Sequence, residues 1–246
     1  MPTTQPLPAL WHEPAPPHFD LRLPCWLKSL LILASTLVAI FFLDQPVAQW
    51  CDAHRLPDLA RQSRGDLARE LMFLEQFGQF TCSVLVILAV ALLDPKGRRR
   101  ALSIAVACLL TLAFTHLIKD LAGRSRPFNA AVPGSTDGHW LWGGPWWGFH
   151  KGSPWGSFPS AHTTAAFALA SSLAWFYPRG RALFMTLATI TAAQRVGHTA
   201  HYLSDVIAGL GIGVFIARAT LSQKLPGRLI ALAPPAVRQW WLQDQP

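Results

Sequence analysis

The sequence contains few charged residues, since Asp, Glu, Lys and Arg together make up only 14% of its 246 positions. Apolar residues make up 51%, which is an unusual balance for a soluble domain of this size. The excess apolar surface predicts a protein embedded in lipid. Eleven tryptophans support this prediction, because Trp is favoured at the interface between the hydrocarbon of a membrane and water.

Cysteine is scarce as well, and this limits the disulfide bonds and zinc sites that the chain can form. The four cysteines, Cys25, Cys51, Cys82 and Cys108, are widely spaced. They form no CxxC pair and no Cys/His spacing typical of a zinc ligand set. We therefore expect neither a disulfide framework nor a zinc site.

The net charge of +8 does not indicate nucleic-acid binding here, because the basic residues form short clusters between apolar runs. Such clusters are typical of the cytoplasmic loops of a membrane protein. Residues 1–25 are Pro-rich and lack the short basic start of a cleavable signal, so the apolar run after them is predicted to be a retained anchor.

Six predominantly apolar stretches approach the roughly 20 residues that cross a bilayer. They cover 26–43, 75–93, 101–118, 160–177, 182–197 and 203–221. The fifth is short and the sixth contains Asp205, so these two are predicted mainly from their neighbours. We expect an all-α polytopic membrane protein. Its domains would be a cytoplasmic segment over 1–25, a six-helix transmembrane domain over 26–221 and a cytoplasmic tail over 222–246.

The basic clusters predict how these six spans are oriented, because Lys and Arg near span ends are retained in the cytoplasm. With six spans, all three clusters fall on one side: Lys96 and Arg98 to Arg100; Arg179 and Arg181; Arg218, Lys224 and Arg228. Segments 44–74, 119–159 and 198–202 then share the opposite face. In a bacterial inner membrane that face is the periplasm.

Two of these outer segments have a spacing or composition that predicts their structure. Leu67, Leu71, Phe73, Leu74 and Phe77 recur roughly at helical spacing, which fits an amphipathic helix on the membrane and equally a packed loop helix. Residues 127–157 are rich in Gly, Pro and Trp without a period, which predicts an ordered loop. This Trp-rich loop is interpreted as an interfacial belt rather than a substrate clamp.

Titratable groups in apolar spans are costly to bury, so their positions indicate function. Five of them lie at predicted span ends on the outer face: Lys119, His162, Arg195, His201 and Asp205. With Arg126, this set offers three cations to hold a phosphoryl group, and the start of the fourth span adds hydroxyl and N–H donors around Ser160. A single embedded carboxylate is a poor cage for Mg²⁺, so we expect metal-independent chemistry.

The spacing of His201 and Asp205 predicts that they interact. Residues four apart share one face of a helix, so the carboxylate would accept a hydrogen bond from one imidazole nitrogen and leave the other nucleophilic. Arg195 lies six residues earlier, which predicts a chain reversal near 197–200 between separate fifth and sixth spans. His162 is a candidate general acid for the departing group.

Three motifs then resemble a known family. Residues 119–127 fit the pattern K-x6-R-P, Pro159-Ser160-Ala161-His162 is similar to P-S-G-H, and Arg195-x5-His201-x3-Asp205 matches most of S-R-x5-H-x3-D. These motifs, in this order, resemble those of the type 2 phosphatidic acid phosphatase (PAP2) superfamily. The resemblance implies a six-helix membrane fold and phosphatase activity without a metal or cofactor. It also implies a phosphohistidine at His201 oriented by Asp205, His162 as proton donor, and phosphate binding by Lys119, Arg126, Ser160 and Arg195.

Two positions depart from the family pattern. Ala161 replaces Gly, which requires only that the backbone there avoid a positive φ. Gln194 replaces the Ser before Arg195, and its amide offers a longer-reaching donor. Outside the motifs, Arg124 is a possible contact for a substrate headgroup or simply a solvated loop charge, and His198 has no assigned role.

The sequence leaves three functions open. The first is a lipid phosphatase acting on undecaprenyl diphosphate, phosphatidylglycerol phosphate, phosphatidic acid or a lipid A phosphate. The second is a phosphotransferase that passes the same phosphoryl group to another lipid. The third is a non-catalytic lipid-binding or transport protein of the same fold. The expected partners are a phosphorylated lipid and membrane lipids, and the sequence does not indicate an oligomeric state.

Overall fold

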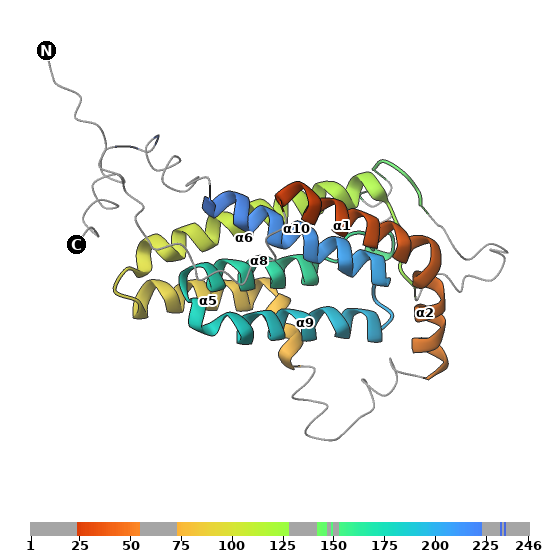
Figure 1. The fold of residues 1–246 in the computed structure, drawn as a ribbon, viewed down its shortest axis with the longest axis horizontal. Coiled ribbons are helices and arrows are strands. Elements are labelled where there is room, and N and C mark those ends of the chain that lie inside the picture. The colour runs from red at the N-terminus through yellow and green to blue at the C-terminus, as the bar shows by residue number, and fades with distance from the viewer. Residues whose placement is uncertain are drawn as a thin grey trace, which may run out of the picture.

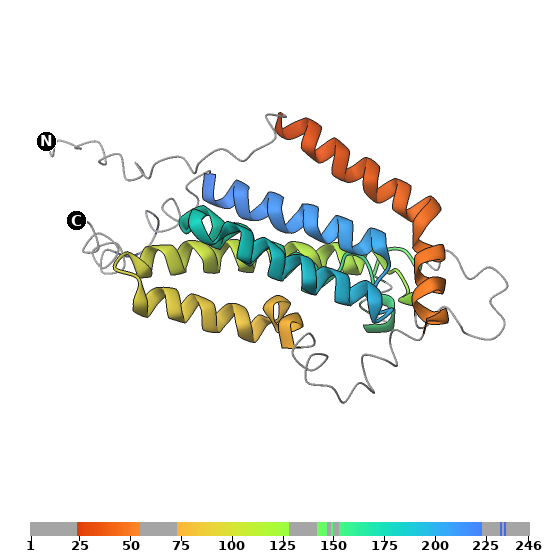
Figure 2. The same ribbon diagram turned by 60° about the horizontal axis from the view of Figure 1, so that its bottom comes forward.

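The computed structural model describes residues 24–54, 73–127, 142–146, 149, 153–222, 232 and 234. Within these ranges every regular element is a helix, and the only β pairing is an isolated bridge between Arg124 and Trp142. The all-α prediction is therefore confirmed for the described part of the chain. The long helices lie side by side, roughly along one direction (Figures 1 and 2).

The five longest helices after residue 54 coincide closely with predicted apolar stretches. The elements are α1 (Cys25–Val38), η1 (Ala39–Leu43), α2 (Asp44–Ala53), η2 (Glu75–Gly78), α5 (Phe80–Leu93), α6 (Gly97–Ala122), η4 (Ser153–Trp155), α8 (Ala161–Phe176), η5 (Pro178–Gly180), α9 (Arg181–Gly197) and α10 (Leu203–Ser222). Hydropathy locates these helices well because each apolar run ends at charged or helix-breaking residues.

Helix α8 is the centre of the bundle and packs against α6, α9 and α10. Small residues allow this close packing, as between helices in membranes. A Cβ atom added at Gly213 of α10 would lie 2.4 Å from the carbonyl oxygen of Thr164 in α8, and one at Gly209 would lie 3.0 Å from that of Ser160. On another face of α10, a Cβ at Gly211 would lie 2.4 Å from Ile32 of α1. The glycines of α10 thus let it fit between α1 and α8.

The N-terminal helix bends where the sequence contains a proline. Helix α1 continues into the π-helical turn η1, and α2 then runs across one end of the bundle in both views (Figures 1 and 2). Pro46 has no N–H to donate to the preceding turn, which explains why the regular hydrogen-bond ladder is interrupted there. The sequence predicted a span ending at residue 43 but did not predict α2. The bend places Asp44, which is buried, at the end of the bundle.

The reversal predicted between the fifth and sixth spans is confirmed. Helix α9 ends at Gly197, and the turn contains Thr199 with a positive φ of 49°. The backbone N–H of His201 donates to the carbonyl of Arg195 at 3.2 Å, which closes the turn. Helix α10 begins two residues later, at Leu203. His201 therefore lies just outside the helix, and Asp205 lies in its first turn.

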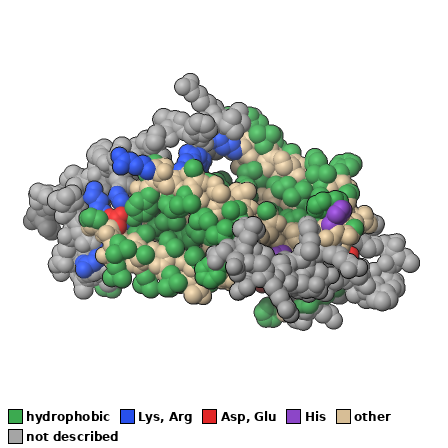
Figure 3. Space-filling model, turned by 90° about the horizontal axis from the view of Figure 1, so that it is seen from below, with side chains coloured by type: hydrophobic (Ala, Val, Ile, Leu, Met, Phe, Trp, Pro, Cys, Tyr) green, Lys and Arg blue, Asp and Glu red, His purple; other side chains and the backbone are tan. Residues whose placement is uncertain are grey.

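Three described helices are long and apolar enough to cross a membrane: Leu27–Ala53, Gly97–Ala122 and Leu203–Ser222. Phe80–Leu93 is a shorter apolar helix. One flank carries a broad hydrophobic surface, with Lys and Arg side chains mainly in one half of the molecule and histidine in the other (Figure 3). This distribution fits a membrane-embedded protein. Most of the predicted amphipathic segment, including Leu67 and Leu71, and much of the Trp-rich loop lie outside the described residues.

Candidate active site

The structure brings the sequence-predicted polar residues together at one end of the bundle. Helix α6 ends there with Lys119, α8 begins there with His162, α9 ends there with Arg195, and α10 begins there with Asp205. The Gly123 cap, with a positive φ of 55°, turns the chain after α6 toward Arg124 and Arg126. Antiparallel packing therefore gathers groups that are up to 86 positions apart in the sequence.

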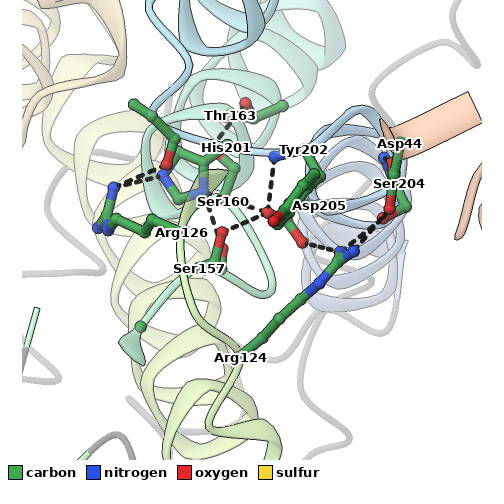
Figure 4. Close-up of polar contacts among 12 residues, drawn as sticks. Asp44, Arg124, Arg126, Ser157, Ser160, Thr163, His201, Tyr202, Ser204 and Asp205 are labelled. Atoms are coloured by element: carbon green, nitrogen blue, oxygen red, sulfur yellow. Dashed lines mark hydrogen bonds and ion pairs between the residues drawn. The ribbon is translucent and has the colours of Figure 1, made fainter. Parts of the chain in front are cut away.

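His201 is almost fully buried and has a defined tautomer. Its Nδ1 atom lies 2.8 Å from the carbonyl oxygen of Ser157, so Nδ1 carries the proton and donates it. The Nε2 atom is then an acceptor, and it lies 3.2 Å from Nη1 of Arg126 (Figure 4). Burial lowers the pKa of His201 to about 3, with the charges of Arg126 and Lys119 acting in the same direction and Asp205 opposing them. The imidazole is consequently neutral, with Nε2 available as a nucleophile.

Asp205 holds His201 less directly than its spacing predicted. Its Oδ2 lies 3.6 Å from Nδ1 of His201, which is beyond hydrogen-bond distance. The same Oδ2 accepts hydrogen bonds from the hydroxyl of Ser157 at 2.5 Å and from the backbone N–H of Tyr202 at 2.9 Å. The hydrogen bond predicted from a shared helix face is thus replaced by a bridge through Ser157, because His201 precedes α10.

Neither interpretation of Arg124 from the sequence, a contact to a headgroup or a solvated loop charge, fits the structure, so both need correction. Its side chain is 2% exposed and lies between two carboxylates: Nη1 donates to Oδ1 of Asp205 at 2.6 Å, and Nη2 donates to Oδ2 of Asp44 at 2.7 Å. Burial alone would lower the pKa of Arg124, but Asp205 and Asp44 raise it above its ordinary value. The guanidinium also lies over the rings of Trp142 and Tyr202. The positive charge of Arg124 is therefore already paired with carboxylates of the protein.

Lys119 and Arg126 lie near His201, and Arg195 lies close to both of these cations. The Nζ atom of buried Lys119 donates to the carbonyl of Gly156, and Arg126 also donates to the carbonyl of Ala200 at 3.1 Å. Burial and the charge of Arg195 lower the pKa of Arg126 below its ordinary value. Cations that are packed this closely and are partly desolvated favour the arrival of an anion.

Arg195 has an anionic partner that the sequence interpretation missed. Its Nη1 forms an ion pair with Oε1 of Glu75, which belongs to η2. The other oxygen of Glu75 lies 3.5 Å from Nδ1 of His198. The cation expected to bind phosphate is therefore paired with a carboxylate of the protein itself. Glu75 was counted as the first residue of an apolar span, and nothing in its local sequence indicates this contact.

The start of α8 presents His162 and buries Ser160. The backbone N–H of Ser160 donates to the carbonyl of Asp205 at 3.0 Å, and its hydroxyl accepts from Thr163 at 3.0 Å. Helix geometry leaves the N–H groups of residues 161–163 without acceptors inside the helix. The side chain of His162 is partly exposed. Its imidazole interacts electrostatically with four charged side chains, those of Arg195, Glu75, Arg126 and Lys119. Donors for an anion are thus provided by the backbone as well as by side chains.

Three further polar residues belong to the same end of the helices that form the site. Gln194 is partly exposed in the last turns of α9, close to Arg195, and His198 lies in the turn that follows. His116 is exposed on α6. The replacement of Gly by Ala161 is accommodated in the first turn of α8.

An apolar groove of about 380 Å³ leads away from His162 between α5, α6 and α8. Its walls include Phe80, Leu88, Leu109 and Leu112, all of which are also exposed on the outside of the bundle. Gly78 also lines the groove, and a Cβ added there would be 2.6 Å from the carbonyl oxygen of His162. The groove therefore opens sideways, toward the space that lipid would fill in a membrane.

Comparisons with known proteins show what this chain is similar to. Residues 100–226 match the model of the PAP2 superfamily, which covers all the polar groups above except Asp44 and Glu75. A lipid A 1-phosphatase of Rhizobium johnstonii is 34% identical over 120 residues, which are 48% of this chain and 46% of that protein. A lipid A 1-phosphatase of Rhizobium etli is 40% identical over 79 residues, which are 32% of this chain and 34% of that protein.

The chain thus aligns with less than half the length of these curated relatives. Among solved structures, it is similar to a transmembrane PAP2-type phosphatidylglycerolphosphate phosphatase from Bacillus subtilis. The TM-score is 0.52 at 15% identity, over 80% of this chain and 96% of the other. At this identity the likeness shows a shared fold.

Proposed function

Because the chain belongs to the PAP2 superfamily, we propose that it is a membrane phosphatase that removes a phosphate group from a lipid headgroup. The observation that carries this proposal is the neutral His201, whose Nε2 faces Arg126 while its Nδ1 is held by Ser157. Such an imidazole is prepared for attack on phosphorus. The Rhizobium relatives make a lipid A 1-phosphate the first substrate to test.

The proposed reaction has two steps. In the first, the lone pair of Nε2 of His201 attacks phosphorus and the bond from phosphorus to the lipid oxygen breaks. His162 enters this step as the imidazolium, which the negative charge of the bound phosphate favours, and it donates its proton to the departing oxygen. In the second, water attacks the phosphohistidine, the N–P bond breaks, and His162 takes a proton from the water. Inorganic phosphate leaves and both histidines return to their starting states.

The remaining polar groups stabilise charge in this reaction. Lys119, Arg126 and Arg195 would contact the non-bridging oxygens of the phosphoryl group, whose negative charge they offset in the transition state. The free N–H groups in the first turn of α8 add donors at a helix N-terminus. The backbone N–H of Ser160 fixes that turn against α10. The family pattern also assigns the hydroxyl of Ser160 to phosphate binding.

The lipid chain would lie in the groove between α5, α6 and α8. This groove begins at His162, so a phosphate at the site and a hydrocarbon chain in the groove can belong to one molecule. Its open side lets a lipid enter from the membrane without passing through water.

The proposed topology has six spans, formed by α1 with η1, α5, α6, α8, α9 and α10. Basic residues at the end opposite the site would then face the cytoplasm, and the site would face the periplasm of an inner membrane. Helix α2 would lie along the outer interface, where Trp50 is exposed.

The test uses purified full-length protein in detergent with a lipid A 1-phosphate labelled in the phosphate, with and without a metal chelator. Wild-type protein should release inorganic phosphate under both conditions, and His201→Ala should release none. His116→Ala, an exposed histidine on α6, is the matched control and should be as active as wild type. Phosphatidic acid, phosphatidylglycerol phosphate and undecaprenyl diphosphate would be assayed in parallel.

Other outcomes would decide against the proposal. Transfer of the label to a second lipid would identify a phosphotransferase. Full phosphate release by His201→Ala would contradict His201 as the nucleophile. No phosphate release by wild-type protein from any of these lipids would identify a non-catalytic protein of this fold. Activity that disappears with the chelator and returns with Mg²⁺ would contradict the metal-independent mechanism.

A further inference from the structure

Asp44 has a buried carboxylate that binds the N-terminal turn of α10, although it lies outside the residues that match the family. Asp44 lies at the start of α2, and its side chain is 5% exposed. Its Oδ1 accepts the backbone N–H of Ser204 at 2.8 Å, and its Oδ2 accepts the hydroxyl of Ser204 at 2.5 Å and Nη2 of Arg124 at 2.7 Å. Both oxygens of this carboxylate are therefore occupied (Figure 4).

The first contact of Asp44 stabilises the N-terminus of α10. Ser204 is the second residue of α10, so its N–H is one of the donors without an acceptor inside the helix. A carboxylate from another segment supplies that acceptor, and its charge interacts favourably with the helix dipole. The position of the first turn, which contains Asp205, is thereby tied to α2.

The second contact of Asp44 fixes Arg124. This guanidinium connects Asp44 with Oδ1 of Asp205 and also donates to the hydroxyl of Ser204 at 2.7 Å. The other oxygen of Asp205 is held by Ser157, which in turn orients His201. Hydrogen bonds to charged groups therefore connect the N-terminal helix to Ser157, and the backbone carbonyl of Ser157 accepts the Nδ1 proton of the nucleophile.

We propose that Asp44 is a positioning residue that acts through Arg124 and Ser204 to hold Asp205 and His201 in their reactive arrangement. The inference rests on the proposed phosphatase function. It assigns a role in the reaction to the N-terminal helices, which lie outside residues 100–226. Displacement of a reacting group by about 1 Å can cost on the order of 100-fold in rate. Loss of a carboxylate that positions such a group can therefore lower the rate by a similar factor, even without contact to the substrate.

The test substitutes Asp44→Asn, which keeps an amide oxygen for the N–H of Ser204 but removes the charge opposite Arg124. The turnover number kcat for a lipid monophosphate in detergent should fall about 10- to 100-fold, while KM changes less than about threefold. That separation is expected because Asp44 contacts neither the phosphate position nor the groove.

A matched control separates this role from a general loss of stability. Asp94 accepts hydrogen bonds from Arg100 at 2.7 Å and from Tyr177 at 2.5 Å, at the opposite end of the bundle, and its side chain is 11% exposed. Asp94→Asn should lower the melting temperature and leave kcat unchanged. Asp52→Asn, an exposed position on α2, should change neither quantity.

A double substitution tests the route of the effect. If Asp44 acts through Arg124, Asp44→Asn should lower kcat much less in an Arg124→Gln background than in wild type. Additive losses, or a wild-type kcat in Asp44→Asn while His201→Ala is inactive, would overturn the inference and leave the proposed function intact. A wild-type protein that releases no phosphate from any of the lipids would overturn both.

Discussion

The Nδ1 atom of His201 lies 2.8 Å from the carbonyl oxygen of Ser157 but 3.6 Å from the carboxylate of Asp205. The imidazole is therefore oriented by a backbone carbonyl, and the carboxylate acts one step further away. The hydroxyl of Ser157 connects the two, since it donates to Asp205 at 2.5 Å. The loop before α8 thus contributes as directly to the candidate nucleophile as α10 does.

This relationship predicts the effect of Ser157→Ala. The substitution keeps the backbone carbonyl but removes a hydrogen bond to a charged group, which is worth about 1.5–3 kcal/mol. We expect kcat to fall roughly tenfold in the phosphate-release assay, with the tautomer of His201 retained. Ser103→Ala, a buried serine near the other end of α6, should leave kcat unchanged. An unchanged kcat in Ser157→Ala would mean that the bridge to Asp205 has no part in the reaction.

The ion pair between Glu75 and Arg195 predicts competition between this carboxylate and phosphate. Glu75→Gln should free Arg195 and strengthen inhibition by inorganic phosphate about tenfold, measured as a lower inhibition constant. Asp120→Asn removes a nearby charge without touching Arg195 and should have a smaller effect. Equal inhibition constants in wild type and Glu75→Gln would show that Glu75 does not compete with the anion.

The low pKa of buried His201 predicts a loss of stability in acid. In the unfolded chain this histidine binds a proton below about pH 6.5, whereas in the folded protein it stays neutral down to about pH 3. The unfolded state therefore gains protons first, and the free energy of unfolding should decrease as pH falls below about 6.5. The decrease from this group is at most about 1.4 kcal/mol per pH unit.

Melting temperatures between pH 7.5 and 4.5 would test this prediction. His201→Gln should show a weaker dependence on pH than wild type, and His54→Gln, an exposed control on α2's C-terminal side, should show the wild-type dependence. Identical slopes for wild type and His201→Gln would mean that His201 is protonated in the folded protein.

The groove predicts a substitution that discriminates between substrates by chain length. Ala105→Phe places a ring in the groove and should raise KM for a long-chain lipid phosphate about tenfold, while KM for a short water-soluble phosphate ester stays constant. Ala113→Phe, on the exposed face of the same helix, is the control. If Ala105→Phe left KM for the long-chain substrate unchanged, the chain would lie elsewhere.

Much of the fold followed from local sequence. The stretches predicted at 101–118, 160–177, 182–197 and 203–221 correspond to α6, α8, α9 and α10, because a long apolar run can satisfy its backbone in lipid only as a helix. The turn after Arg195 was also predictable, since the spacing to His201 is unsuitable for one continuous helix. Helix α2 was not, because its few apolar residues form no extended pattern.

The sequence by itself determined the long apolar helices and the motif residues that gather at one end, since both depend on residues close together in the chain and on the alternation of span direction. The tertiary structure decided the contacts of those groups: Asp44 with Ser204 across 160 positions, Arg124 with Asp205 across 81, and Glu75 with Arg195 across 120. Each depends on how helices pack, and small shifts in packing change which carboxylate meets which cation. Arg124 was therefore misassigned from its neighbours, although they had indicated correctly that it lies near the site.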